Sequence, residues 1–300
     1  MSPRRTLAAI AAALGVGAAF AHSQELRLPN KSDSLKFAVI GDTGTASRQQ
    51  NEVGALMESY RQKFPFELVI MVGDNMYGRQ GPQDFVSKFE APYKAMLDAG
   101  VKFYAALGNH DDPGQRNYKF FNMNGERYYT FRGAGGLTGK VGGAAVRFFA
   151  LDSNYMDKTQ IDWLEKELAG SGSEWKICFL HHPLYSSARK HGSSLDLRAI
   201  LEPLFVRYGV SVVFAGHDHV YERTKPQQGI VHFVSGAGGS LRKGDLRKSE
   251  FTAVGYDQDF HFMLVEIAGD EMHFQAVSRT GNTVDAGVVH RTAPPAAASR

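Results

Sequence analysis

The sequence predicts an α/β fold in which two mixed β-sheets pack face to face with helices flanking them, a four-layer αββα sandwich. Between residues 35 and 215, apolar β-type runs alternate with segments of helical periodicity, as in sheets whose strands are joined by helices. After His219 only short strands follow, so the last part is meander-like. The chain has 300 residues with 43% hydrophobic content and can bury one large core, so we expect one domain.

The elements of the first half follow from hydrophobic spacing. Val53, Leu56, Met57 and Tyr60 recur at the spacing of one helix face, whereas the strand segments are short and continuously apolar. Gly100 ends the second helix, because glycine readily adopts the conformation that closes a helix. We expect strands at 35–40, 67–72 and 102–107 and helices at 46–64 and 82–99.

The elements of the second half are bounded by turn residues. The stretch from Asp112 to Lys140 is rich in Gly, Asn and aromatic residues, so we expect only a short strand there, followed by a loop or hairpin. The expected strands are 128–132, 144–151, 175–180, 210–215, 230–235, 260–268, 271–278 and 283–290, the helices are 159–169 and 195–208, and the loop is 133–143.

The first 21 residues have the features of a signal peptide. Arg4 and Arg5 precede an apolar stretch, and Ala19-Phe20-Ala21 fits a small-x-small cleavage site. The alternative is a short membrane anchor, but the run is broken by glycines and is shorter than the roughly 18 residues that a span needs. We therefore expect a secreted or periplasmic protein without a stable membrane anchor. The paired arginines also resemble a twin-arginine signal.

Charge and cysteine content exclude several classes of partner and site. The net charge is +3, and removal of Arg4 and Arg5 leaves about +1, which argues against electrostatic binding to nucleic acid. Cys178 is the only cysteine, so an intrachain disulfide, an iron-sulfur cluster and a thiolate zinc site are all excluded. Its apolar neighbours favour a buried, structural role.

Five short segments place metal-ligand residue types where a predicted strand ends and a loop begins. In open α/β sheets such loops converge outside the carboxyl ends of the strands, so we expect these side chains to meet. The segments are Gly41-Asp42-Thr43-Gly44, Gly73-Asp74-Asn75-Met76-Tyr77, Gly108-Asn109-His110-Asp111, His181-His182-Pro183 and Gly216-His217-Asp218-His219.

The donor types in these segments indicate the kind of ion. Carboxylates, imidazoles, an amide carbonyl and a phenolate together suit first-row transition ions better than calcium or magnesium. Two such ions about 3.5 to 4 Å apart can bind both oxygens of an in-line phosphoryl displacement, and they lower the pKa of a bridging water. The sequence therefore predicts a two-metal hydrolase site with one bridging carboxylate.

The order of these motifs resembles the purple acid phosphatase branch of the calcineurin-like metallophosphoesterases, over roughly residues 35 to 240. Two positions indicate the branch. Gly44 stands where other metallophosphoesterases commonly have His, and Tyr77 stands where they lack a tyrosine. The resemblance implies the metallophosphoesterase form of the αββα sandwich and a ferric ion, which a phenolate donor favours.

The resemblance also implies roles for single residues. Fe(III) would be held by Asp42, Tyr77 and His219. Fe(II), Zn or Mn would be held by Asn109, His181 and His217, and Asp74 would bridge the two ions. His110 would touch the phosphate or help to protonate the leaving oxygen, and His191 resembles a second catalytic histidine of that kind.

Other interpretations stay open for several of these residues. His181 is preferred to His182 as the ligand because the family places the ligand two residues before proline, and because adjacent strand residues face opposite ways. His182 and His191 could equally have surface or packing roles. Taken singly, Asp42 and Asp74 could be turn formers or helix caps.

We thus expect an exported binuclear phosphatase of the acid phosphatase type that hydrolyses phosphomonoesters by attack of a metal-bound hydroxide. Its partner would be a small phosphoester substrate. The alternatives are a phosphodiesterase or nucleotide hydrolase with the same metal centre, and a non-catalytic protein that binds metal or phosphate. The expected segments are the signal peptide 1–21, an N-terminal linker 22–34, the catalytic domain 35–292 and a disordered tail 293–300.

Overall fold

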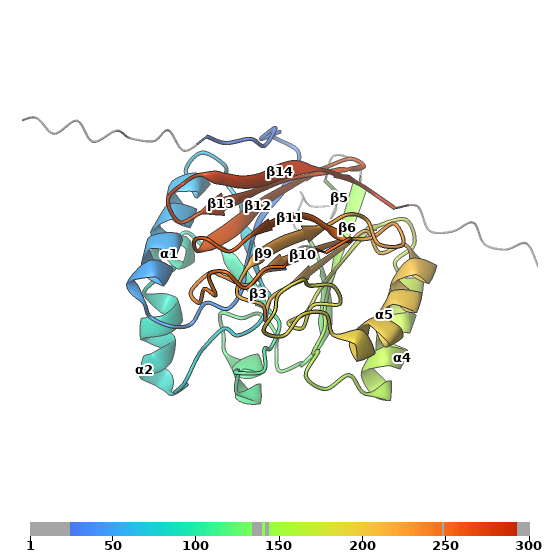
Figure 1. The fold of residues 1–300 in the computed structure, drawn as a ribbon, viewed down its shortest axis with the longest axis horizontal. Coiled ribbons are helices and arrows are strands. Elements are labelled where there is room, and N and C mark those ends of the chain that lie inside the picture. Colours follow the sequence, from blue (N-terminus) through green and yellow to red (C-terminus); the bar gives the residue numbers. More distant parts are fainter. Residues whose placement is uncertain (1–24, 134–139, 142–143, 248, 293–300) are drawn as a thin grey trace, which may run out of the picture.

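The computed structural model describes residues 25–133, 140–141, 144–247 and 249–292. Within these ranges the chain forms two mixed β-sheets with helices on their outer faces, which confirms the predicted fold class (Figure 1). The predicted signal peptide, the tail and most of the loop at 133–143 lie outside the described residues. None of the helices in the described ranges has the length and apolar character that crossing a membrane requires.

The first sheet has six strands in the order β14-β13-β12-β1-β2-β3. β1, β2 and β3 run parallel, and β12 pairs with β1 in the antiparallel sense. The carboxyl ends of the three parallel strands therefore lie at one edge of this sheet. The strands are β1 Leu35–Ile40, β2 Leu68–Met71, β3 Lys102–Ala105, β12 His261–Ala268, β13 Glu271–Ser278 and β14 Thr283–His290.

The second sheet has eight strands, in the order β11-β9-β10-β8-β7-β6-β4 with β5 paired to β6. β6, β7, β8 and β10 are parallel neighbours. The strands are β4 Tyr129–Arg132, β5 Lys140–Val141, β6 Ala144–Ala150, β7 Trp175–Phe179, β8 Val212–Ala215, β9 Tyr221–Thr224, β10 Val231–Ser235 and β11 Thr252–Tyr256.

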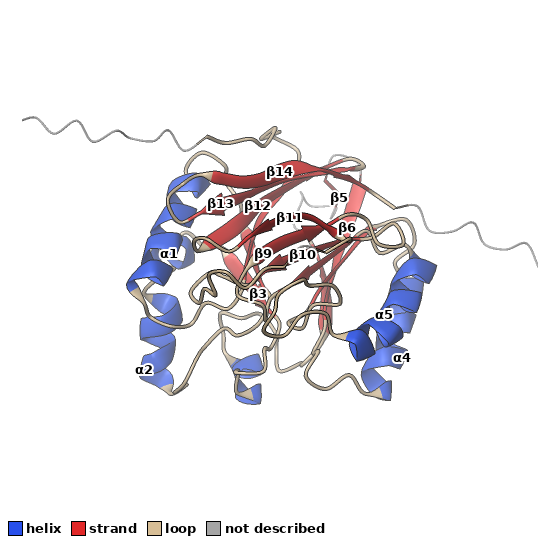
Figure 2. Cartoon of the chain, in the orientation of Figure 1, coloured by secondary structure: helices blue, strands red, loops and turns tan. Residues whose placement is uncertain are grey.

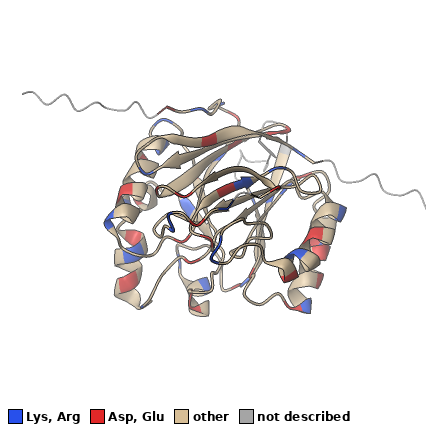
Figure 3. Ribbon diagram, viewed as in Figure 1, with Lys and Arg blue, Asp and Glu red and all other residues tan. Residues whose placement is uncertain are grey.

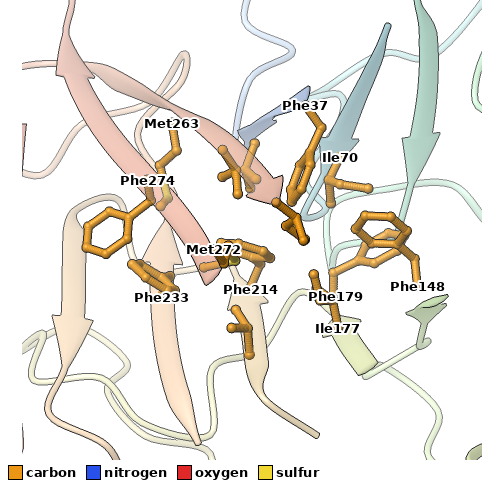
Figure 4. Packing of buried hydrophobic residues seen from close by; sticks show 14 of the residues in the cluster. Phe37, Ile70, Phe148, Ile177, Phe179, Phe214, Phe233, Met263, Met272 and Phe274 are labelled. Atoms are coloured by element: carbon orange, nitrogen blue, oxygen red, sulfur yellow. The ribbon is translucent and has the colours of Figure 1, made fainter. Parts of the chain in front are cut away.

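An apolar layer fills the space between the two sheets, where side chains from both point toward one another (Figure 4). Phe37 of β1 packs edge-on against Phe148 of β6 and Phe214 of β8, with ring centroids 5.3 and 6.2 Å apart. Each such buried ring contributes about 1.5–3 kcal/mol relative to an exposed one. This layer fixes the position of one sheet relative to the other.

Helices cover the outer face of each sheet (Figure 2). α1 (Arg48–Arg61) begins at Ser47, whose Oγ accepts a hydrogen bond from the backbone N–H of Gln50, and it packs Val53 and Met57 against the six-stranded sheet. α4 (Lys158–Ala169) and α5 (Leu195–Tyr208) bury leucines against the eight-stranded sheet.

The helix predicted at 82–99 is interrupted. The segment forms α2 (Pro82–Phe85), a π-turn at Val86–Glu90, a turn, and α3 (Lys94–Asp98). Pro92 has no backbone N–H to donate to the carbonyl of Lys88, which instead accepts a hydrogen bond from Gln50 Nε2 at 2.6 Å. The prediction of a single continuous helix was therefore wrong. The predicted end at Gly100 agrees with the structure, where this glycine follows the last helical turn with φ of +80°.

The described part of the predicted N-terminal linker lies on the six-stranded sheet. Leu28 is buried. The carboxylate of Glu266 in β12 accepts backbone N–H hydrogen bonds from Asn30 and Lys31, both at 2.6 Å. Residues 25–34 are thus held against β12 before β1 begins.

Candidate metal centre

The predicted ligands come together where the carboxyl ends of five central strands meet. Asp42 follows β1, Asp74 and Tyr77 follow β2, and Asn109 follows β3 of the six-stranded sheet. The remaining three come from the eight-stranded sheet: His181 after β7, and His217 and His219 after β8. The two sheets therefore contribute to one site.

Asp42, Tyr77 and His219 form the first half of this site. Tyr77 Oη lies 3.2 Å from Asp42 Oδ1 and 3.0 Å from His219 Nε2. His219 Nε2 is 3.4 Å from Asp42 Oδ1. Ligand atoms of Asp42, Asp74 and His219 all lie within 4.8 Å of one another, a spacing at which one ion can contact all three.

Asn109, His181 and His217 form the second half. His181 Nε2 lies 3.0 Å from Asn109 Oδ1 and 3.2 Å from His217 Nδ1. It is also 3.3 Å from Asp74 Oδ1. Asp74 therefore faces both halves, as a bridging carboxylate must.

Backbone geometry aims these side chains into the site. Asp42, Asp74 and His217 all have positive φ, of 54°, 49° and 70°, a region that residues with a Cβ occupy rarely. A Cβ at Gly108 would overlap the carboxylate of Asp74, and one at Gly216 would overlap that of Asp42. The glycines thus permit the close approach, and the strained residues occur at a candidate functional site.

Neighbouring backbone groups orient the ligands. His181 Nδ1 lies 3.0 Å from the carbonyl oxygen of Val72, which can only accept, so Nδ1 carries the hydrogen and Nε2 offers its lone pair to the site. The N–H of His217 donates to Asp42 Oδ2 at 3.0 Å, and that of His110 donates to Asp74 Oδ1 at 2.9 Å.

The electrostatics of the site fit a pair of cations. Burial and the negative charge of Asp74 raise the pKa of Asp42 well above its ordinary value. Burial, followed by neighbouring histidines, lowers the pKa of His217 to about 2, and burial lowers that of His219 to about 4. Neutral imidazoles have the protonation state that binds metal. Bound cations would also offset the repulsion between the adjacent carboxylates.

The two predicted catalytic histidines lie beside this centre. The ring of His110 is 4.9 Å from that of Tyr77, and the ring of His191 is 4.1 Å from that of His217, measured between centroids. Both side chains belong to exposed residues, so a substrate can reach them.

Two carboxylates that support the site, one partly buried and one fully buried, were not predicted from the sequence. The side chain of Asp111 accepts backbone N–H hydrogen bonds from Gly108, Asn75 and Met76 at 2.8, 3.0 and 3.0 Å, and so joins the loops after β2 and β3. Burial raises the pKa of Asp111 to about 7. The residue types of the motif gave no sign of this role, because its partners are backbone groups of another loop.

The second of these carboxylates is Asp218, between the two histidines that follow β8. Its Oδ2 accepts hydrogen bonds from Ser186 Oγ at 2.6 Å and from the N–H of Gly192 at 3.1 Å, which ties down the loop that carries His191. The sequence did contain a signal for this role of Asp218. In an extended segment adjacent side chains face opposite ways, so a residue between two ligands points away from the ions.

Solved structures with a similar fold include several phosphatases. Purple acid phosphatase PPD1 from yellow lupin (Lupinus luteus) seeds aligns with a TM-score of 0.68 at 20% identity, over 88% of this chain and 55% of that chain. GAP50, described as the anchor in the inner membrane complex of Plasmodium, aligns with a TM-score of 0.72 at 19% identity, over 87% of this chain and 90% of that chain. At these identities the likeness concerns the fold.

Sequence relatives support the branch. Human (Homo sapiens) tartrate-resistant acid phosphatase type 5 is 26% identical over 91% of this chain and 97% of its own length. Purple acid phosphatase 23 of Arabidopsis thaliana is 29% identical over 74% of this chain and 57% of its own length. The resemblance to the purple acid phosphatase branch is thus confirmed, as is the interpretation of the chain as an enzyme of the metallophosphoesterase superfamily. Residues 35–221 match the sequence model of the family described as Calcineurin-like phosphoesterase, and the chain belongs to that family.

Proposed function

We propose that this chain is an exported phosphatase of the acid phosphatase type that uses two metal ions to hydrolyse phosphomonoesters, with residues 35–292 as its catalytic domain. The observation that supports the proposal is the position of Asp74, whose carboxylate lies within 4.8 Å of ligand atoms of Asp42 and His219 and 3.3 Å from His181 Nε2 of the other half. GAP50 has a similar fold and is described as an anchor, so the fold alone does not imply catalysis. The proposal therefore depends on the donor set.

Bound at these two positions, the ions would supply Lewis acidity toward the phosphate oxygens and an activated water. In the reaction a water oxygen bonds to phosphorus, the bond from phosphorus to the ester oxygen breaks, and the alcohol departs with one proton of that water. Asp74, oriented by the N–H of His110, holds the two halves at a fixed separation. His110 and His191 lie at the exposed side, where they can hydrogen-bond the phosphate or the departing oxygen.

For the metals, we assign Fe(III) to Asp42, Tyr77 and His219, and Fe(II), Zn or Mn to Asn109, His181 and His217. Burial and two neighbouring carboxylates raise the pKa of Tyr77 above its ordinary value, so the phenolate forms only beside a cation of high charge. A relative named Fe(3+)-Zn(2+) purple acid phosphatase 12, from Arabidopsis thaliana, is 31% identical over 66% of this chain and 45% of its own length.

The visible spectrum and metal content test the assignment. The purified protein is expected to contain two metal ions, one of them iron, and to show a broad absorption band from phenolate-to-iron charge transfer. Tyr77→Phe should remove the band. Tyr104→Phe, which changes a partly buried tyrosine of β3 outside the site, should keep it. A colourless and fully active wild type without iron would overturn the ferric assignment but leave the phosphatase proposal standing.

A further inference from the structure

A cavity of about 500 Å³ opens beside the second half of the candidate metal centre. Its lining includes Asn109 and His182, which border the metal centre, together with Tyr155, Leu197 and Pro113. Cavities of this size hold small organic molecules, and this one starts where a phosphate would contact the ions.

Ser153 holds His182 in place in the wall of the cavity. Ser153 Oγ accepts from the backbone N–H of His182 at 3.0 Å and lies 2.9 Å from His182 Nδ1. When the serine hydroxyl donates to Nδ1, the hydrogen of the neutral ring is on Nε2, and in that tautomer His182 is a donor. Its ring lies 4.4 Å from that of His217, and a ring nitrogen of His182 lies within 4.8 Å of ligand nitrogens of His181 and His217.

The lining of the cavity also includes an exposed aromatic ring and apolar side chains. Tyr155 is 62% exposed, which makes it the most exposed large hydrophobic residue in the described part of the chain. Leu197 is buried at the first turn of α5. An aromatic side chain open to solvent beside a cavity gains free energy when a ring covers it.

The cationic group of the cavity is already neutralised. Arg127 is the one lysine or arginine among the described residues that line it. Its guanidinium binds Asp152 at 2.9 Å and Asp157 at 3.1 Å, so this charge cluster carries a net negative charge. Figure 3 shows acidic and basic residues interspersed along the ribbon. A second anionic group on the substrate would therefore meet no free cation here.

We propose that this cavity is the leaving-group subsite and that it accepts uncharged alcohols bearing an aromatic ring, with Tyr155 contacting the ring and His182 donating to an oxygen of the ester. This inference rests on the proposed function for the identity of the phosphate site. The preferred substrates are then aryl or arylalkyl phosphomonoesters, and monoesters with a carboxylate or a second phosphate on the alcohol are disfavoured.

Binding of phosphonates, which are not hydrolysed, tests the subsite on the metal-loaded protein. By calorimetry, benzylphosphonate should bind about tenfold more tightly than methylphosphonate, because its ring is buried. Tyr155→Ser should reduce that preference by about threefold to tenfold. Val288→Ser, which changes an exposed apolar residue of β14, should leave it unchanged. Equal affinities for the two phosphonates, or an unaltered preference in Tyr155→Ser, would overturn the subsite.

A charge variant tests the exclusion of anions. Asp157→Asn keeps an N-cap side chain for α4, which Asp157 now provides to the N–H of Gln160, but it frees part of the Arg127 charge. Affinity for 3-phosphonopropionate should rise about twofold to fivefold at low salt, the size expected for a half-exposed pair. Asp162→Asn, on the same helix and paired with exposed Lys158, should have no effect. No gain in Asp157→Asn would overturn the charge argument.

Turnover separates this inference from the proposed function. Metal-loaded wild type is expected to hydrolyse phenyl phosphate. Absence of turnover with the benzyl preference intact would refute the phosphatase proposal and keep the subsite as a binding site. Turnover without a preference for benzylphosphonate would support the phosphatase proposal and refute the subsite.

Discussion

At the scale of single residues, Asp74 connects the two halves of the site. Asp74→Asn removes one negative charge between two cations while keeping the shape of the side chain. Turnover of an aryl phosphate should fall by roughly 100-fold or more, the scale seen when a charge-stabilising group is lost. Metal content, measured by mass spectrometry after gel filtration, should fall at both positions.

The control for this prediction is His110→Ala. That side chain is exposed and makes no contact that would hold an ion, so turnover should drop with both metals retained. Full metal content and normal turnover in Asp74→Asn would show that another group bridges the ions.

The residue types of the site could be predicted because each motif is local. A glycine, an acid or histidine, and a strand end are all visible within a few positions, as at Gly41 and Asp42. The supporting contacts were not visible, because the partners of Asp111 and the serine that orients His182 lie in other loops. Their roles as metal ligands and catalysts stay predictions until the variants are made.

At the scale of elements, Gly100 ends α3 with φ of +80° and no atom near the position of a Cβ. Gly100→Ala should therefore lower the free energy of unfolding by about 1 kcal/mol through backbone strain alone. Urea denaturation of wild type and variant measures the difference.

Gly170 provides the matched comparison. It follows α4 with φ of −76°, and a Cβ there would make an ordinary contact with the carbonyl of Lys166. Gly170→Ala should change the free energy of unfolding by less than about 0.5 kcal/mol or stabilise the protein slightly. Equal destabilisation by both variants would argue against the strain explanation.

Most elements could be located from periodicity, since α5, β1, β13 and β14 have the predicted bounds and the other predicted strands differ from theirs by one or two residues at an end. β9 and β11 were missed. β9 reads Tyr221-Glu222-Arg223-Thr224, and a buried glutamate breaks the apolar pattern of a strand. Its carboxylate is satisfied by the N–H of Ser187 and the hydroxyl of Thr252, partners that only the folded chain brings near.

At the scale of the whole molecule, two buried histidines outside the site link stability to pH. His261 of β12 and His232 of β10 are almost fully buried, and within the described residues their ring nitrogens have no hydrogen-bond partner. Burial lowers the pKa of each to about 3. In the unfolded chain the pKa is about 6.5.

The sign follows from proton binding. Between about pH 6.5 and pH 3 the unfolded chain binds a proton at His261 that the folded chain does not, so stability is complete above that window and is lost as the pH falls through it. At pH 5 the loss is about 2 kcal/mol for each histidine.

His261→Phe should reduce this acid sensitivity. The free energy of unfolding of the metal-free protein, measured in urea at pH 8 and pH 5, should decrease less in the variant by about 1–2 kcal/mol. His290→Phe, at the exposed end of β14, should behave like wild type. An unchanged difference between the two pH values in His261→Phe would show that the ring is protonated in the folded state.

The split origin of the ligands has a consequence for the architecture. Asp42, Asp74, Tyr77 and Asn109 belong to one sheet, and His181, His217 and His219 belong to the other. An ion in either half would therefore cross-link the two layers at the end of the sandwich. Metal binding would then hold the two sheets together at this end. The melting temperature should rise in proportion to the logarithm of the free metal concentration.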